Sequence, residues 1–206
     1  VRAWGDAPIQ VKLSPAVDLA QLEAYGGAVT FISAQGDLKE AMLTLHNDSR
    51  GLEAVLLTSD GTAYTWTHES IPQARPTSAP RAWLIEPDPA LLRAGLVQHT
   101  AQAFDAYQMD TTIAYLTGDT HPDSVWARAW QIEAWMPFNL KALRAYLRAR
   151  DVGTLTVKKR GSPLTPEQLT AQLRLKGNAS RTVALTRHNG APIVIICADY
   201  APRFYQ

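Results

Sequence analysis

The sequence predicts a mixed α and β chain in two parts: a β-rich unit, followed by a small α+β domain. Three observations lead to this prediction. Short apolar runs dominate residues 1–68, prolines cluster in 69–89, and from residue 129 period-2 apolar runs alternate with two amphipathic helical patterns. Strands with few helices are expected in the first part, and a compact layered domain is expected in the last.

Residues 1–68 contain the elements of the first part. Strands are expected at 9–13, 28–33, 38–45, 53–58 and 63–68. Asp18 can cap a helix that ends at Gly26-Gly27. Asp60-Gly61 favours a hairpin turn between the last two strands.

Residues 69–128 are expected to connect the two parts. Proline recurs throughout 69–89, which excludes a helix or a central strand and predicts a linker. Asp88 followed by Pro89 is typical of a helix start, because a capping carboxylate precedes a first-turn proline. That helix is expected to run to about Tyr107.

Residues 129–206 follow the order strand, helix, strand, helix, strand, strand. The expected bounds are 129–135, 139–150, 154–160, 165–174, 181–187 and 191–198. Asn139 can cap the first helix, and Thr165 with Gln168 forms a capping box for the second. His188-Asn189-Gly190 favours a hairpin turn between the last two strands.

Several short segments carry a family resemblance. Segments 156–161, 166–167, 173–177 and 184–187 resemble the THUMP-like module that closes a family of bacterial class I S-adenosylmethionine-dependent methyltransferases. Segments 11–18, 31–41, 86–95 and 114–119 resemble the same family's fifth strand, the hairpin beyond it and the connection to the THUMP-like part. The resemblance implies a partial class I methyltransferase (Rossmann-like) sheet in 1–68 and a THUMP-like α+β domain in 129–206. It also implies the C-terminal portion of such an enzyme.

The cofactor half of such an enzyme is not visible in this sequence. A class I methyltransferase holds its cofactor with a glycine-rich turn after the first strand and an acidic residue after the second. Gly26-Gly27 follows an expected helix rather than a strand, so it does not match the glycine-rich turn. Asp88-Pro89 is followed by Ala90, and we interpret Asp88 as a helix cap rather than as a cofactor or catalytic residue. We therefore expect S-adenosylmethionine in the full-length protein and none in this chain, and we assign no catalytic residue. The chain lacks an initiator Met, which predicts a trimmed chain or a fragment.

Other chemistry is not expected. The five histidines are scattered without an i, i+4 pair, so no metal site is predicted. Cys197 lies in the apolar run 193–197 and is expected to be a small core residue. No apolar run approaches the roughly 20 residues that span a bilayer, and no secretory signal opens the chain. A cytoplasmic protein without membrane contact is expected.

Basic residues concentrate at the end of the chain. From residue 137 on, 12 basic residues stand against 3 acidic ones, whereas the part before it carries 8 basic and 16 acidic residues. Alternation in 154–160 places Lys158 and Arg160 on one strand face, with Leu155 and Val157 directed to the core. The candidate nucleic-acid contacts are Lys158, Lys159, Arg160, Arg174, Lys176 and Arg181.

A solvated surface is the alternative, in which charges protect an edge strand from aggregation. The resemblance favours RNA contact over this alternative. Trp126, Trp130 and Trp135 lie among apolar residues, so core packing is expected for them rather than base stacking.

The leading hypothesis is therefore the C-terminal portion of an RNA-directed methyltransferase whose THUMP-like module contacts the substrate. The alternative is a non-catalytic nucleic-acid-binding or protein-interaction module. The strand at 9–13 is central in class I methyltransferases, and its neighbour is absent here. The open edge of the apolar strand at 9–13 is expected to pair with a second copy of the chain, which would form a homodimer. The alternatives are that residues 1–7 cover this edge or that the region is poorly ordered.

Overall fold

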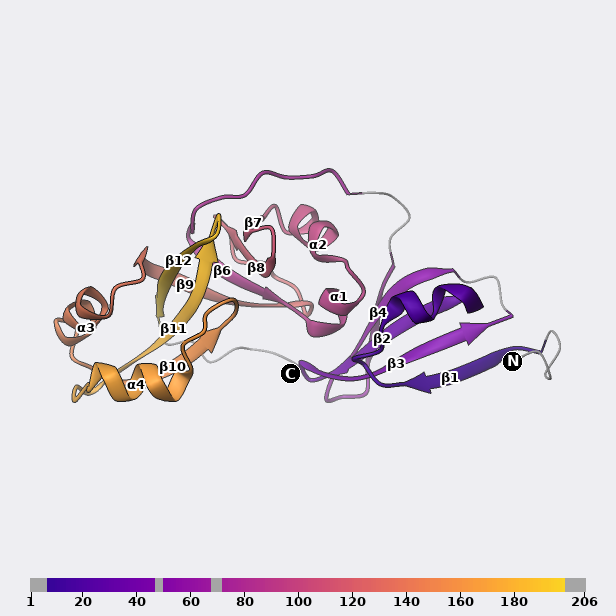
Figure 1. Cartoon of the computed structure of the whole chain (residues 1–206), viewed down its shortest axis with the longest axis horizontal. Coiled ribbons are helices and arrows are strands. Elements are labelled where there is room, and N and C mark those ends of the chain that lie inside the picture. The colour runs from indigo at the N-terminus through magenta and orange to yellow at the C-terminus, as the bar shows by residue number, and fades with distance from the viewer. Residues whose placement is uncertain (1–6, 47–49, 68–71, 199–206) are drawn as a thin grey trace. The chain divides into compact units, whose positions relative to one another are not determined.

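The structure is a computed structural model that describes residues 7–46, 50–67 and 72–198 (Figure 1). Within these residues the chain divides into two compact units. The first comprises residues up to 73 together with 87–100, and the second comprises 74–86 together with residues from 101 on. Each unit has a sheet of its own, with five strands in the first and seven in the second. The expected strand end at His68, linker residues 69–71 and the cover by residues 1–7 fall wholly or mostly outside the described residues.

The sheet of the first unit has the order β1-β3-β2-β4-β5. Its strands are β1 Ile9–Leu13, β2 Ala28–Ala34, β3 Asp37–Leu45, β4 Gly51–Leu57 and β5 Ala63–Trp66. The five expected strands are thus confirmed, as is the hairpin between β4 and β5. Phe31, Ala41 and Leu56 are completely buried in its core.

Two short 3-10 turns replace the helix that we expected after Asp18. They are η2 Leu19–Gln21 and η3 Glu23–Tyr25. Asp18 does cap the first turn through Ala20 N, and Gly26 with φ of 66° ends the second. So short a segment gains too few hydrogen bonds to offset the cost of starting an α-helix.

Strand β1 lies at the edge of its sheet. In the part of the chain that the structure describes, it pairs antiparallel with β3 and has no strand on its other side. Ile9, Val11 and Leu13 are half-buried, whereas Gln10 and Lys12 are exposed. One row of backbone N–H and C=O groups is therefore open to a further strand.

The sheet of the second unit has the order β10-β11-β12-β9-β6-β8-β7. The last part of the chain is as expected: β9 Ala127–Pro137, α3 Leu140–Arg148, β10 Val152–Lys159, α4 Pro166–Leu173, β11 Ala179–His188 and β12 Ala191–Ala198. Asn139 caps α3, and the capping box of Thr165 and Gln168 begins α4, both as predicted.

Two apolar clusters fill the faces of this sheet. Helices α3 and α4 cover one face, where their leucines, such as Leu147 and Leu173, pack on β11 and β12. On the other face, Leu84, Tyr115 and Trp130 pack against Ile195. The sheet curls around this second cluster, so that β7 contacts β11 (Figure 1).

The connecting region differs from the sequence prediction. Residues 83–87, expected in a linker, form β6 Trp83–Pro87 inside the second sheet. Prolines exclude a strand only where they interrupt its hydrogen bonds, and here they stand outside it or at its last residue. Strands β7 Tyr107–Asp110 and β8 Ile113–Gly118 were also missed. The single helix expected from Pro89 is two, α1 Pro89–Arg93 and α2 Val97–Ala103, because Gly95 lies between them with φ of 71°.

Candidate nucleic-acid interface

Strand β10 shows the alternation that the sequence predicts. Leu155 and Val157 pack against the apolar cluster beneath α3 and α4, whereas Thr154 and Thr156 are exposed. Lys158 lies on the opposite side, with its Nζ 4.2 Å from the centre of the Trp130 ring. The Lys158 side chain therefore lies against Trp130 on the inner face of the curved sheet rather than in solvent.

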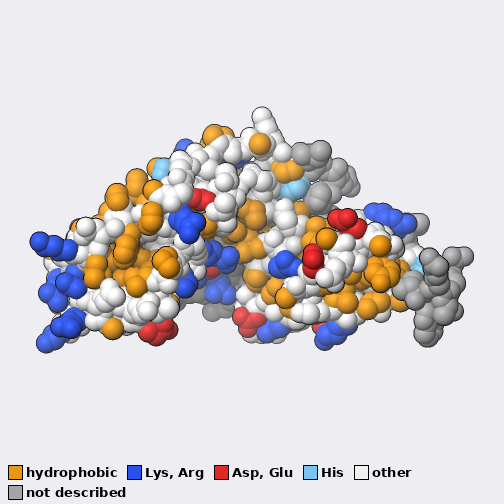
Figure 2. All heavy atoms as spheres, in the orientation of Figure 1, with side chains coloured by type: hydrophobic (Ala, Val, Ile, Leu, Met, Phe, Trp, Pro, Cys, Tyr) orange, Lys and Arg blue, Asp and Glu red, His pale blue; other side chains and the backbone are white. Residues whose placement is uncertain are grey.

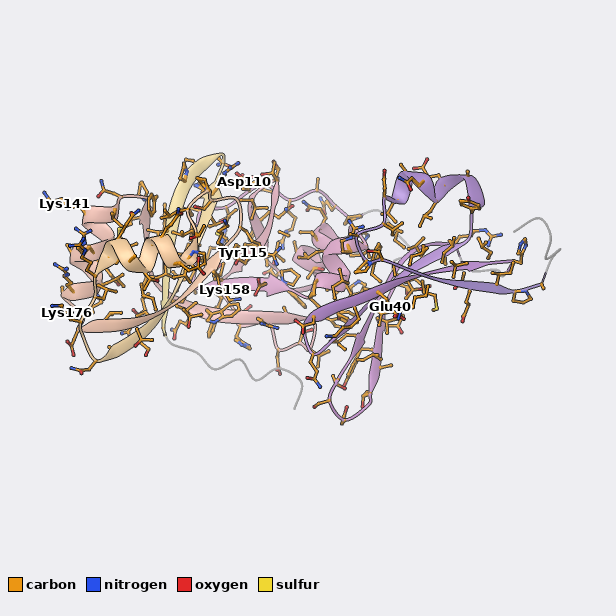
Figure 3. The ribbon with its side chains drawn as sticks, turned by 60° about the horizontal axis from the view of Figure 1, so that its bottom comes forward. Glu40, Asp110, Tyr115, Lys141, Lys158 and Lys176 are labelled. Carbon is orange, nitrogen blue, oxygen red and sulfur yellow. The ribbon has the colours of Figure 1, made fainter. Side chains whose placement is uncertain are left out.

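Lys158 and Arg160 meet Glu86 on that face. Lys158 Nζ lies 2.6 Å from Glu86 Oε2, and an Arg160 guanidinium nitrogen lies 3.2 Å from Glu86 Oε1. The Glu86 and Lys158 side chains are only 16% and 18% exposed. Burial raises the pKa of the Glu86 carboxyl, but the two cations outweigh it and hold that pKa below the usual value. Lys158 and Arg160 are thus both ion-paired with the internal carboxylate of Glu86. Figure 3 shows Lys158 among the strands of the second unit.

Arg181 is occupied in a similar way. Its Nε lies 2.8 Å from a carboxylate oxygen of Glu133, and both side chains are about a quarter exposed. A second guanidinium nitrogen donates to Ser180 O. Three of the six predicted contact residues, Lys158, Arg160 and Arg181, are therefore held in ion pairs of the second unit.

The other three predicted residues are free of such pairs. Lys159, Arg174 and Lys176 are exposed and form no ion pair within the described residues. Arg174 ends α4 in the left-handed region with φ of 49°. Arg174 and Lys176 line an open groove of about 560 Å³ together with Arg148, Asp151, Val152 and Gly177.

Helix α3 adds cations that sequence reasoning missed. Arg144 donates to Gln172 O at 2.6 Å and Arg148 to Arg174 O at 3.1 Å, so both hold the C-terminal carbonyls of α4. With the exposed Lys141 they recur at positions i, i+3 and i+7, which place side chains on one side of a helix. That spacing was the signal in the sequence. We call Lys141, Arg144, Arg148, Arg174 and Lys176 the basic end. Figure 2 shows Lys and Arg side chains at the left edge, near α3 and the end of α4, and Figure 3 shows Lys141 and Lys176 at this end.

Two backbone segments, one at the start of β10 and one after α4, pack closely beside the groove. A Cβ atom added to Gly153 or Gly177 would collide with the backbone of the opposite segment, so both positions require glycine. The Asp151 carboxylate accepts hydrogen bonds from the backbone N and the side-chain amide of Asn178, at 3.3 and 3.0 Å. These contacts fix the segment that carries Arg174 and Lys176 against the start of β10.

The tryptophans differ from the expectation in one case. Trp126 and Trp130 are buried, as predicted, but Trp135 is 39% exposed. The expectation of core packing is therefore wrong for Trp135. Strand β9 has 11 residues and its neighbour β6 has 5, so the end of β9 extends past β6 and gains less cover.

Other candidate chemistry is limited to a few observations. Cys197 is buried, and burial raises its thiol pKa to about 12, as expected for a core cysteine. In the described residues no three His, Cys, Asp or Glu side chains gather into a potential metal site. Nor does any described helix have the length and apolarity needed to cross a membrane.

Comparison with known proteins places these features in a family context. A family model described as THUMP domain-like matches residues 127–199. Proteins from two strains of Mycobacterium tuberculosis, each named as an uncharacterised S-adenosylmethionine-dependent methyltransferase, are 30% identical over 185 residues. That alignment covers 87% of this chain and 50% of each relative, so the chain spans about half their length.

A solved structure shows the same fold. It is the crystal structure of a protein from Porphyromonas gingivalis that is described as a candidate methyltransferase, and it matches with a TM-score of 0.75 at 20% identity. The match covers 95% of this chain and 52% of that protein.

Proposed function

We propose that this chain, a relative of the C-terminal half of S-adenosylmethionine-dependent methyltransferases with a THUMP-like domain, is the part that contacts the substrate. In this proposal the substrate is RNA, and the basic end binds it. Cofactor binding and methyl transfer belong to the other half of the enzyme, and we assign no catalytic residue to this chain.

The observation that carries the proposal is the set of cations that line the groove, Arg148, Arg174 and Lys176, with Lys141 on the same side of α3 as Arg148. Lys141, Arg148, Arg174 and Lys176 are exposed, and none forms an ion pair within the described residues. Asp151 is the one acidic residue that lines the groove, and its carboxylate already accepts two hydrogen bonds from Asn178. Unneutralised Lys and Arg side chains favour phosphate, because each contact releases a condensed counterion from the nucleic acid.

The proposed contacts include half of the residues that the sequence singled out. Arg174, Lys176 and Lys159 remain as candidates, whereas Lys158, Arg160 and Arg181 would have to leave a carboxylate before they could bind phosphate. Such an exchange is unfavourable for Lys158, which is only 18% exposed.

The experiment is a titration of the chain with RNA at several salt concentrations. Arg174→Ala combined with Lys176→Ala is expected to weaken binding for all sequences and to flatten the dependence of log K on log [salt] by about 1.4 to 1.8. The matched control is Lys39→Ala combined with Arg50→Ala, which removes the same charge from exposed positions of the first unit outside β1. Equal effects of the two double variants would contradict a specific role of the basic end.

We further propose that β1 pairs with a second copy of this chain. The open edge of β1 and its half-buried Ile9, Val11 and Leu13 support this proposal. Sedimentation equilibrium tests it, since a chain that remains monomeric at every accessible concentration would contradict it. In a longer protein, a strand of the preceding half could occupy the same edge.

A further inference from the structure

Helix α4 ends in a backbone conformation that does not suit its residue. Arg174 lies in the left-handed region, with φ of 49° and ψ of 55°. Helices that end in this way usually carry Gly at that position, and sometimes Asn, because a Cβ atom makes the conformation unfavourable. Arg174 is the only Lys or Arg among the six described non-glycine residues with a positive φ. A long cationic side chain is therefore kept where glycine would fit better.

The end of α4 does not need the Arg174 guanidinium. A basic side chain near a helix C-terminus stabilises the helix when it binds the last carbonyl groups. Here Arg144 and Arg148 of α3 already donate to carbonyl oxygens at this end, those of Gln172 and Arg174. The Arg174 side chain itself is exposed and has no hydrogen bond or ion pair with any described residue. Helix capping thus does not explain its presence.

The charged side chains around Arg174 converge on one groove. Arg148 and Lys176 line it together with Arg174, and Asp151 is the carboxylate among the lining residues. Three cations against one carboxylate leave an excess of about two positive charges. Leu175 packs into the apolar cluster beneath the helices, which anchors the chain between Arg174 and Lys176. Such a fixed set of cations suits a phosphate group, whose oxygens match the fork of a guanidinium.

We propose that this groove is a fixed site for one phosphate group, in which Arg174 makes a bidentate contact, rather than a part of a diffuse positive surface. The inference rests on the proposed function, which makes RNA the source of the phosphate, and it deepens that function by naming the group that the groove recognises. Strained backbone is retained at ligand sites where it positions a side chain. The left-handed backbone of Arg174 is retained for this reason, because it places the guanidinium at the groove.

Arg174→Gly separates binding from folding. It removes the guanidinium but suits the left-handed backbone, so the midpoint of urea unfolding is expected to stay the same or to rise. The affinity of the whole chain for single-stranded RNA is expected to fall roughly 10- to 100-fold. Arg174→Lys keeps the charge and loses the fork, so it is expected to recover only part of that affinity. The matched control Arg50→Gly removes the same side chain from an exposed position outside the groove and is expected to leave the affinity nearly unchanged.

Two measurements identify the phosphate and its source. Inorganic phosphate, titrated against the whole chain and followed by NMR, is expected to shift the amide signal of Gly177, which lines the groove, and Arg174→Gly is expected to abolish this shift. RNA that ends in a 5′-phosphate is then compared with the same RNA that ends in a 5′-hydroxyl. A loss with Arg174→Gly that is confined to the phosphorylated RNA assigns a terminal phosphate to the groove, and equal losses assign an internal one.

The possible failures have different meanings. If Arg174→Gly lowers stability and keeps RNA affinity, the side chain supports the fold and the inference is wrong. If Arg174→Lys binds RNA as tightly as the unaltered chain, the surface is diffuse, which contradicts a fixed site while the proposed function stands. If the unaltered chain binds no RNA but inorganic phosphate shifts the Gly177 signal, the proposed function fails and the phosphate site remains. Absence of both responses contradicts both.

Discussion

Glu86→Gln tests the ion cluster that joins β6 to β10. Glu86 holds both Lys158 and Arg160, and none of the three side chains is more than 33% exposed. The substitution keeps the shape of the side chain and removes its charge. Two cations would then remain partly desolvated with no carboxylate between them, and the second unit is expected to become less stable.

The magnitude follows from burial. Removal of one partner from a buried ion pair costs about 3–5 kcal/mol, whereas exposed pairs are worth about 0.2–1 kcal/mol. Because the cluster retains some contact with water, we expect a loss of about 2–4 kcal/mol for Glu86→Gln. Glu133→Gln in the same unit removes the partner of Arg181 at 28% exposure and is expected to cost about 1 kcal/mol or less.

Urea unfolding followed by tryptophan fluorescence and circular dichroism measures both variants. A loss for Glu86→Gln no larger than that for Glu133→Gln would refute the assignment of Glu86 as the internal anchor.

The pH dependence of the same cluster has a definite sign. The pKa of Glu86 is lowered in the folded chain, so its stabilisation is present above its unfolded value of 4.5 and is lost as pH falls through the folded pKa. The gap in stability between the unaltered chain and Glu86→Gln is therefore expected to be full at neutral pH and to close below pH 4.5. A gap that widens in acid would contradict this sign.

Three further outcomes are expected. Asp88 accepts hydrogen bonds from Ser33 Oγ at 2.6 Å and from Ala90 N at 2.9 Å. Asp88→Ala should therefore lower the unfolding free energy by about 2–4 kcal/mol. A loss below about 0.5 kcal/mol would contradict the role of Asp88 as a buried cap. Cys197 should resist alkylation in the folded chain at pH 8 and react only after unfolding, as followed by mass spectrometry, because its thiol is buried and its pKa is raised to about 12. This chain alone should not bind S-adenosylmethionine, and calorimetric detection of a one-to-one complex tighter than about 100 μM would overturn that expectation.

Local signals predicted most elements of the chain. Asn139, Thr165 and Gln168 fixed helix starts because a cap acts within one turn, and turn residues such as Asp60-Gly61 fixed a hairpin for the same reason. Two of the misses, the strand β6 and the break between α1 and α2, concern prolines and Gly95, whose effect on the backbone depends on the surrounding fold. Trp83, Leu84 and Ile85 form a strand among prolines because a sheet neighbour on each side gives it partners.

The candidate site was harder to predict, because charge pairing depends on contacts between distant segments. Glu86 and Lys158 are 72 residues apart in the sequence, and the residues around each of them do not indicate that the two side chains form an ion pair. Alternation correctly separated Lys158 from Val157, but it could not show that Lys158, unlike the exposed Thr154 and Thr156 on the same face of β10, reaches an internal carboxylate. The apolar residues next to Trp135 in the sequence also could not show that the end of β9 extends beyond β6, where Trp135 is exposed.

The position of β9 in the second sheet has a consequence for the order of synthesis. One neighbour of β9 is β6, which precedes it in the chain, and the other is β12, the last described strand. As the chain leaves the ribosome, β6, β7 and β8 can associate early, but β9 keeps one open edge until Ala198 has emerged. The face that Ile195 and Cys197 complete is therefore incomplete for most of translation. Truncation before β12 should therefore leave an aggregation-prone intermediate.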